Sequence, residues 1–304
     1  MTKTTTNLLL MLITILAGTY FFITCCSSCG LMAKEEEPVK EAVTAPVAPE
    51  ATSYPFAFAD GAYEVNENDN YNFNVSSSSI LLPLSGKVTA GIASLKTYLA
   101  ENVGKVINVT GYYKADENND SAFPNLGLAR ANAVKNHLVE NGLSSTQINT
   151  LSQLMGEMIS KDNVYLGPVA YSLADKAVDA DDELQALYDQ INADPLVLYF
   201  DTGEAAINLS AEQRQKVADI SRYLDKVEGA TAKVIGHTDS KGIRATNMQL
   251  GQGRADFAKA YLIKNGIAES KIFASSEGPD NPVETNDTEA GRAKNRRTVV
   301  TLNK

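Results

Sequence analysis

The sequence predicts an α/β fold built from two tandem units, each a small mixed β-sheet with helices against one face, behind an N-terminal apolar segment. Three observations support this prediction. Segments with the patterns of strands alternate with segments that repeat apolar residues at helical spacing. The second half of the chain repeats the pattern of the first half about 125 residues later. The first 32 residues contain a long uncharged run.

The composition sets broad limits on function. The chain has 304 residues and a formal net charge of −10 at pH 7. This length is sufficient for two domains of ordinary size. A protein that binds the backbone of nucleic acids needs a basic face, so the acidic balance argues against a nucleic-acid partner.

The N-terminal segment, which we assign to residues 1–32, has the pattern of a membrane anchor or a signal segment. Residues 7–26 read NLLLMLITILAGTYFFITCC without a charge, whereas Lys3 precedes them and Lys34-Glu35-Glu36-Glu37 follows. A bilayer span needs about 20 apolar residues, and the apolar part of a cleavable secretory signal is usually shorter, on the order of 7–15 residues. Because positive charge tends to stay on the cytoplasmic side, we expect export of the rest of the chain, which in a Gram-negative cell means the periplasm.

The three cysteines, Cys25, Cys26 and Cys29, lie at the outer end of this segment. One interpretation is lipidation of Cys25 or Cys26 after signal cleavage. Lipoprotein signals usually have a Leu three residues before the modified Cys, and here Phe22 and Ile23 stand there. A redox or metal site at Cys26-x-x-Cys29 would need a second ligand pair or a surrounding βαβ pattern, which the sequence lacks. An uncleaved anchor therefore fits the pattern better than a lipoprotein, and both remain open.

Residues 33–54 have the composition of a linker. They contain Pro38, Pro46 and Pro49 and an excess of acidic residues, without a helical repeat. Such a segment buries too little apolar surface to fold by itself, and its prolines stiffen it into a spacer. We expect it to separate two folded units, 55–175 and 195–304, from the membrane.

The two units are copies of one pattern. With an offset of about 125 residues, Gly236 falls on Gly111, and after a slip of one residue Arg254 falls on Arg130. The apolar positions of one predicted helix also coincide: Val217, Ile220, Tyr223 and Leu224 fall on Ile92, Leu95, Tyr98 and Leu99. A register that holds across apolar and glycine positions indicates a duplication.

Each unit is predicted to run strand, helix, strand, loop, helix, strand, strand. In the second unit the strands are PLVLYFD, which ends in a turn at Gly203, and then AKVIGH, KIFASSEG and RTVVTLN. Ser210 is the expected N-cap of the first helix, and Asn265-Gly266 ends the second. The apolar stripes of the two helices are Val217, Ile220, Leu224 and Val227, and Ala255, Ala258 and Leu262. Residues 176–194 carry apolar residues at helical spacing and predict a connecting helix.

Three blocks of the second unit carry a family resemblance: VLYFDTGEAAINLS, then VIGHTDSKGIRATNMQLGQGRADFAKAYLIKNGI, then ETNDTEAGRAKNRRTVVTL. Together they resemble the OmpA-like C-terminal domain, a family shared by outer-membrane proteins, peptidoglycan-associated lipoproteins and flagellar-stator proteins. The resemblance runs from Pro195 to Leu302. One departure is Gly251, where the family usually has Ser, and we expect this change at the start of a helix.

The resemblance implies that the second unit binds peptidoglycan non-covalently through the diaminopimelate of its stem peptide. Diaminopimelate carries a carboxylate and an ammonium on one carbon, so its receptor needs a cation and an anion close together. Arg254 suits the carboxylate because a guanidinium donates two parallel hydrogen bonds, and Asp239 suits the ammonium. Thr238 and Asn247 are candidates for neutral hydrogen bonds to the ligand. Arg296 is a candidate for a further contact or for a structural role.

The same interpretation predicts no enzymatic activity, no cofactor and no metal. His237, Asp239 and Ser240 do not form a triad, because neighbours along a strand point to opposite faces. One alternative stays open, in which Asp239 and Arg254 only form a salt bridge within the fold and the protein is an envelope scaffold for a protein partner. The resemblance favours the outer membrane as the site of the anchor, and an inner-membrane anchor also fits.

The first unit is predicted to have lost the ligand. In the register above, Asp239 falls on Lys114 and Asn247 on Phe123, so an anion becomes a cation and a hydrogen-bonding side chain is lost. We expect Arg130 to remain unpaired, with Asp116 as the candidate to replace the missing acid. The apolar positions are retained, which predicts a folded unit that serves as a spacer or as a docking module for an envelope protein.

Overall fold

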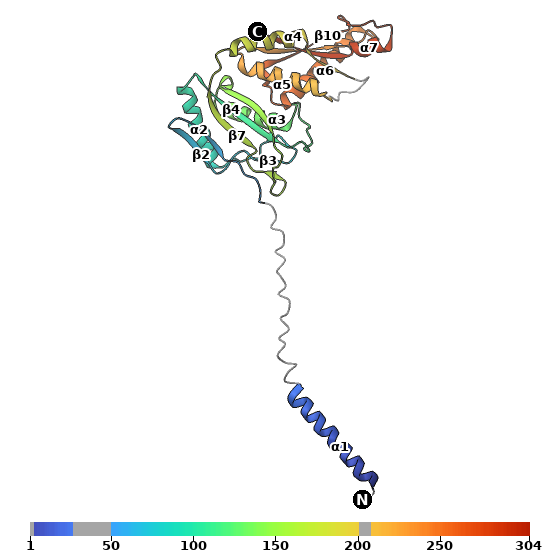
Figure 1. The fold of residues 1–304 in the computed structure, drawn as a ribbon. Coiled ribbons are helices and arrows are strands. Elements are labelled where there is room, and N and C mark those ends of the chain that lie inside the picture. Colours follow the sequence, from blue (N-terminus) through green and yellow to red (C-terminus); the bar gives the residue numbers. More distant parts are fainter. Residues whose placement is uncertain (1–2, 27–49, 201–207) are drawn as a thin grey trace. The chain divides into compact units, whose positions relative to one another are not determined.

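The computed structural model describes residues 3–26, 50–200 and 208–304 (Figure 1). Contacts divide the chain into two compact units, residues 1–49 and 50–304. The first contains α1 (Lys3–Phe21) and a short π-helical turn, Phe22–Cys26. The sequence predicted a membrane span here; within the described ranges, however, no helix is both long enough and apolar enough to cross a bilayer. Cys29 and residues 33–49 of the predicted linker lie outside the described residues.

The C-terminal half of the second unit contains a mixed sheet with helices packed on it (Figure 1). The described strands follow the order β10-β9-β11-β8, in which β10 runs parallel to β9 and β11 runs antiparallel to both β9 and β8. The elements are α4 (Ala180–Ala193), β8 (Leu196–Tyr199), α5 (Ala211–Lys226), β9 (Thr231–His237), α6 (Arg244–Lys264), β10 (Ile272–Gly278), α7 (Glu289–Asn295) and β11 (Arg297–Asn303). The predicted α/β class is confirmed; the expected turn at Gly203 lies outside the described residues.

The apolar stripes of α5 and α6 form the core of this half, as the sequence predicted. Ser210 caps α5: its hydroxyl accepts from the Gln213 N–H (3.1 Å), and its own N–H donates to the Gln213 side chain (2.9 Å). A cap of this kind contributes about 1 kcal/mol, whereas burying one Val, Leu or Ile side chain contributes about 1.5–3 kcal/mol. Packing therefore determines where the helices lie. The buried stripe residues are Val217, Ile220, Leu224, Ala255, Ala258 and Leu262.

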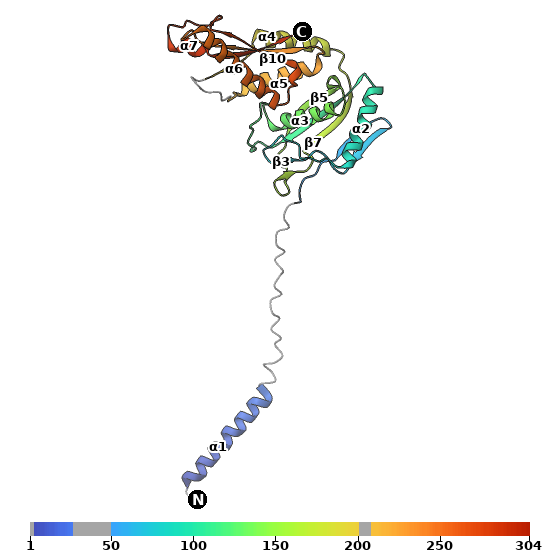
Figure 2. The same ribbon diagram turned by 180° about the vertical axis from the view of Figure 1, so that it is seen from behind.

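The N-terminal half of this unit has a second mixed sheet. Three of its strands follow the order β5-β4-β7, with β4 parallel to β5 and antiparallel to β7 (Figure 2 views them from behind). The N–H of Thr52 donates to the carbonyl of Ile159 (3.0 Å), so the folded part begins before the predicted boundary at residue 55. The elements are β1 (Phe56–Asp60), β2 (Tyr63–Glu67), β3 (Phe73–Asn74), α2 (Gly86–Glu101), β4 (Lys105–Tyr113), α3 (Leu126–Glu140), β5 (Ile148–Leu154), β6 (Val164–Tyr165) and β7 (Val169–Asp175).

The two halves share the arrangement of their central strands and of the helix that crosses them. The orders β5-β4-β7 and β10-β9-β11 have the same strand directions. In each half, a strand touches a helix at two glycines. A Cβ on Gly111 would lie 1.9 Å from the carbonyl oxygen of Gly127, and one on Gly236 would lie 1.9 Å from that of Gly251. Only glycines permit this approach of strand to helix, and the match supports the predicted duplication.

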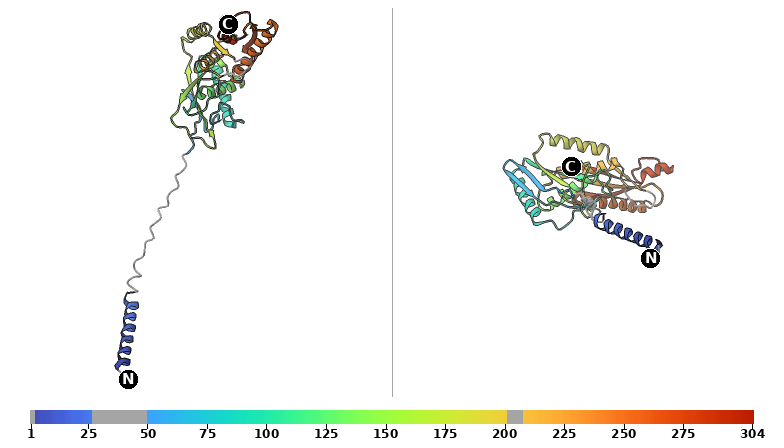
Figure 3. Two further views of the ribbon diagram at one scale, coloured as in Figure 1. Left: turned by 90° about the vertical axis from the view of Figure 1, so that its right-hand side faces the viewer. Right: turned by 60° about the horizontal axis from the view of Figure 1, so that its bottom comes forward.

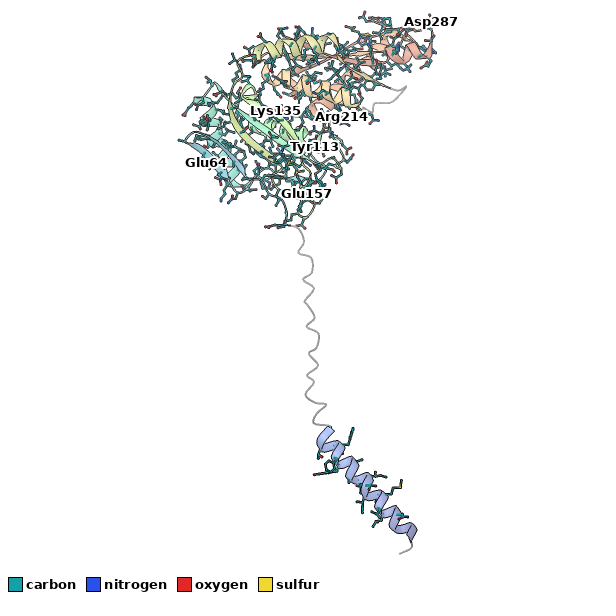
Figure 4. The ribbon with its side chains drawn as sticks, in the orientation of Figure 1. Glu64, Tyr113, Lys135, Glu157, Arg214 and Asp287 are labelled. Carbon is teal, nitrogen blue, oxygen red and sulfur yellow. The ribbon has the colours of Figure 1, made fainter. Side chains whose placement is uncertain are left out.

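Buried polar contacts join the two halves. Lys135 of α3, labelled in Figure 4, is 2% exposed and pairs with Asp225 at the end of α5. The backbone N–H of Ala122 donates to the Asn265 side chain (2.8 Å). A cavity of about 350 Å³ lies at the same junction, lined from both halves, and none of the predicted site residues lines it. The ion pair and the hydrogen bond therefore connect α3 and the loop before it to α5 and the end of α6.

The connecting helix α4 holds the last strand. The side chain of Asn192 donates to the carbonyl of Leu302 (3.3 Å) and accepts from the Leu302 N–H (2.9 Å). The ammonium of Lys304 lies 4.6 Å from the ring centroid of Tyr188. The C-terminus therefore lies beside α4, as the views in Figures 1 and 3 show.

Candidate functional site

The site residues gather where β9 ends and α6 begins. The close contact between Gly236 and Gly251 brings the backbone of α6 onto the end of β9. Arg254 lies three residues beyond Gly251, on the same helix face, and its Nη1 donates to the carbonyl of His237 at 3.2 Å. The sequence interpretation of Gly251 as a helix-start residue is wrong, because α6 begins at Arg244 and Gly251 lies inside it.

Arg254 is a buried cation. The residue is 6% exposed, and its guanidinium lies 5.7 Å from the ring centroid of Phe200. Burial lowers the pKa of Arg254, the Arg296 guanidinium lowers it further, and Asp239 opposes both effects. Among the ion pairs of the described residues, none involves Arg254. Within the described part of the chain, the His237 carbonyl, the Phe200 ring and the field of Asp239 compensate its charge.

Asp239 is held by Arg296 rather than by Arg254. Nη1 of Arg296 donates to Oδ2 of Asp239 at 3.1 Å, and Nη2 donates to Oε1 of Glu289 at 2.8 Å. Burial lowers the pKa of Arg296, but the hydrogen bonds to the two carboxylates outweigh it, and the net shift is upward. The salt bridge between Asp239 and Arg254 that the sequence left open is not among the described contacts. These two contacts are of the structural kind that the sequence left open for Arg296, and a further contact with a ligand stays a prediction.

Thr238 and Asn247 shape the loop that carries Asp239. The side-chain amide of Asn247 donates to the carbonyls of Asp239 (3.2 Å) and Lys241 (3.0 Å), and the Thr238 hydroxyl donates to the Asp239 carbonyl (2.9 Å). The backbone N–H of Lys241 donates to Oδ1 of Asp239 (3.0 Å). The Thr238 hydroxyl and the Asn247 amide thus donate to backbone carbonyls of this loop, and through it they orient Asp239.

A second loop, residues 283–288, closes the site and was missed by the sequence interpretation. Asn295 is fully buried; its side-chain oxygen accepts from the N–H groups of Val283 (2.8 Å) and Glu284 (3.0 Å). Its amide donates to Asn286 (3.1 Å), and Asn286 in turn accepts from the N–H of Ser240 (3.1 Å). One signal was available: Thr288 followed by an acidic residue marks a helix start, and Thr288 does cap α7.

His237 lies beneath the site. It is 5% exposed, its Nδ1 has no hydrogen-bond partner among the described atoms, and Oε2 of Glu277 lies 3.9 Å from that nitrogen. Burial lowers the pKa of His237, the Arg297 cation lowers it further, and Glu277 opposes the shift. The imidazole is therefore neutral at pH 7, and its backbone carbonyl rather than its ring faces Arg254.

Comparisons with known proteins identify the C-terminal half. Residues 199–296 match the model of the OmpA family. Outer membrane protein A of Bordetella avium is 36% identical over 94 residues, which are 31% of this chain and 48% of that protein. Probable lipoprotein YiaD of Escherichia coli (strain K12) is 35% identical over 103 residues, 34% of this chain and 46% of that protein.

Two further relatives are peptidoglycan-associated lipoproteins by name. That of Buchnera aphidicola subsp. Baizongia pistaciae is 33% identical over 103 residues, 34% of this chain and 58% of that protein. The crystal structure of the one from Burkholderia pseudomallei is 26% identical and has a TM-score of 0.32, covering 35% of this chain and 89% of that chain. The chain covers less than two thirds of the length of each of the three curated relatives. Residues 50–175 lie outside the family match.

Proposed function

From the premise that residues 199–296 form an OmpA-family domain, we propose that this protein is a non-catalytic envelope anchor. Its C-terminal half binds peptidoglycan through the diaminopimelate of the stem peptide, and its N-terminal segment holds it at a membrane. The names of relatives from Buchnera aphidicola and Mycobacterium bovis, a peptidoglycan-associated lipoprotein and a peptidoglycan-binding protein, support this ligand.

One observation carries the proposal: Arg254 is a buried guanidinium without an ion pair among the described residues, next to an acid that is already oriented. Leaving a buried charge without a partner is costly. A ligand carboxylate would supply the missing partner through two parallel hydrogen bonds. The ammonium on the same carbon would then meet Asp239, whose carboxylate is 16% exposed and is held in one orientation by Arg296 and the Lys241 N–H.

The alternative of an envelope scaffold rested on a purely structural pair between Asp239 and Arg254. The described contacts give Asp239 a different structural partner, Arg296. A buried cation without an ion pair among residues 50–200 and 208–304 is better explained by a ligand than by the stability of the loop.

Pull-down on purified sacculi tests the proposal with the full chain. We expect Asp239→Ala and Arg254→Ala each to weaken binding at least tenfold, because each loses a charged hydrogen bond of about 1.5–3 kcal/mol. Arg244→Ala is the matched control, since Arg244 lies on the same helix with a side chain 65% exposed and pairs with Asp280. Sacculi with lysine in place of diaminopimelate should bind less. Wild-type binding by both site variants would rule out the site.

Attachment through residues 1–32 is tested separately. Leu10, Leu16 and Phe21 of α1 are each more than half exposed, as the apolar side chains of a membrane-attached helix would be. Deletion of residues 1–32 is expected to release the protein from washed membranes. Substitution of Cys25 and Cys26 by Ser separates the two modes: release assigns attachment to a lipid, and retention assigns it to the apolar segment.

A further inference from the structure

Arg130 in the N-terminal half occupies a site with the same construction as that of Arg254. It lies three residues beyond Gly127, which contacts Gly111 as Gly251 contacts Gly236. Its Nη1 donates to the carbonyl of Tyr112 at 2.8 Å, and Tyr112 falls on His237 in the offset of the duplication. Its guanidinium also lies 5.8 Å from the ring centroid of an aromatic residue, Phe73.

The difference between the two sites is a carboxylate. Glu117 accepts from Nη2 of Arg130 at 2.5 Å and from Nη1 at 3.1 Å. It also accepts from the backbone N–H groups of Ser76 (3.1 Å) and Lys114 (2.9 Å). A carboxylate has about four acceptor positions, and all are used: two by Arg130 and one each by Ser76 and Lys114. The two side chains are 0% and 3% exposed.

The loop that carries Glu117 is adapted to this contact. It has twelve residues (114–125) between β4 and α3, against six (238–243) between β9 and α6. Proline disfavours helical conformation before it, and here Pro124 is followed by Asn125, which caps α3 by accepting from the Leu128 N–H. The helix therefore starts later than α6 does, and the chain before it is free to bring Glu117 back to Arg130. Ser76 has a φ of +56°, a region that residues other than glycine rarely adopt.

The expectation that Arg130 is unpaired is wrong, and Asp116, the candidate for the missing acid, does not pair with it among the described contacts. Asp116 pairs with Lys114 at 3.3 Å, and its side chain is 73% exposed. The acid that meets Arg130 is Glu117, one residue further along the loop.

We propose that Glu117 is an internal ligand: its carboxylate occupies, on Arg130, the place that a bound carboxylate would take on Arg254. The N-terminal half thus contains a carboxylate site that the chain itself closes. Taken together with the proposed function, on which this consequence rests, the protein presents one open wall-binding site per chain rather than two.

Chemical rescue tests the closed site in the full chain. Glu117→Ala removes a CH2–COO⁻ group, which has the carbon and oxygen atoms of acetate. We expect its thermal midpoint to fall by about 10 °C, because Arg130 is left as an unpaired buried cation. Acetate at about ten times its dissociation constant should restore about 3–5 °C relative to chloride at equal ionic strength. Asp116→Ala is the matched control and should show neither effect.

Two further variants make every outcome decisive. Glu117→Gln fills the space with an amide and should be destabilised without responding to acetate. Glu117→Ala combined with Arg130→Met should lose the acetate response, because the cation is gone. Should Glu117→Ala not fold in chloride, recovery of its near-UV circular dichroism in acetate is the expected result. The proposal is overturned if Glu117→Ala has the same thermal midpoint in acetate and chloride, or if it stays unfolded in both.

This experiment is independent of wall binding. Acetate has no ammonium group, so Lys114, which falls on Asp239 in the duplication, does not repel it. A response to acetate together with failed sacculus binding would leave the closed site intact and remove the proposed function. Sacculus binding without a response to acetate would support the proposed function and overturn the closed site.

Discussion

Arg296 donates a hydrogen bond of 3.1 Å to Asp239, a residue 57 positions earlier in the chain. Asp239 and Arg254 were the predicted acid–base pair, yet the acid is oriented by a different arginine. Arg296 also holds Glu289, so one guanidinium fixes two carboxylates at the edge of the site. Arg254 itself has no ion pair among the described residues, and its Nη1 donates to the His237 carbonyl.

Arg296→Gln tests whether this orientation matters for binding. The variant removes the cation that holds Asp239, and we expect roughly tenfold weaker binding to sacculi, corresponding to about 1.4 kcal/mol. The fold should survive, as circular dichroism will report. Arg244→Gln is the control, because its pair with Asp280 is exposed and such pairs contribute little. Unchanged affinity in Arg296→Gln would mean that Asp239 does not contact the ligand.

Arg254→Lys tests whether ligand binding needs two parallel hydrogen bonds from residue 254 or only its positive charge. Lysine keeps the positive charge and cannot donate two parallel hydrogen bonds. We expect weaker sacculus binding, by about 1.5–3 kcal/mol for a lost charged hydrogen bond. Arg244→Lys, the control, should leave the affinity for sacculi unchanged. If Arg254→Lys bound as well as the wild type, only charge would be needed at this position.

Gly236→Ala is expected to destabilise the C-terminal half and to weaken the site. The added Cβ would lie 1.9 Å from a backbone oxygen of α6, so strand and helix must separate. Overpacking of this kind costs about 1–3 kcal/mol, and it shifts Arg254 away from the end of β9. Gly253→Ala is the control, because a Cβ there meets nothing within 4 Å. In a helix that exchange is stabilising by up to about 1 kcal/mol. Urea denaturation of both variants measures the difference.

The stability of the protein should decrease as the pH falls below 6.5, in part through His237. Its pKa in the folded chain lies below the ordinary value of 6.5, because burial and Arg297 disfavour the charged ring. Between the lowered pKa of the folded chain and 6.5, the unfolded chain binds more protons than the folded chain. The free energy of unfolding therefore decreases as the pH decreases. His237→Asn should show a smaller loss of thermal midpoint between pH 7.5 and 5.5. Equal losses in the two proteins would show that His237 does not contribute.

The order of strands and helices could be predicted because it depends on local patterns. Apolar spacing marked the stripes of α5 and α6, and Ser210 marked a cap. The matching glycines, Gly111 and Gly236, could be seen as a repeat in the sequence, but the sequence did not show that each contacts a helix. A close contact between Gly236 and Gly251 is a property of two elements, and neither segment carries a sign of it by itself.

The sequence by itself determined the fold class, the repeated pattern and the residue types of the candidate site. The tertiary structure alone decided which charges meet: Asp239 with Arg296, Arg130 with Glu117, and Arg254 with no described acid. The physical reason is that ion pairs across loops depend on the path of the backbone in three dimensions, which follows no period in the sequence. Desolvation then makes each choice costly to reverse, because a buried charge that loses its partner has no water to replace it.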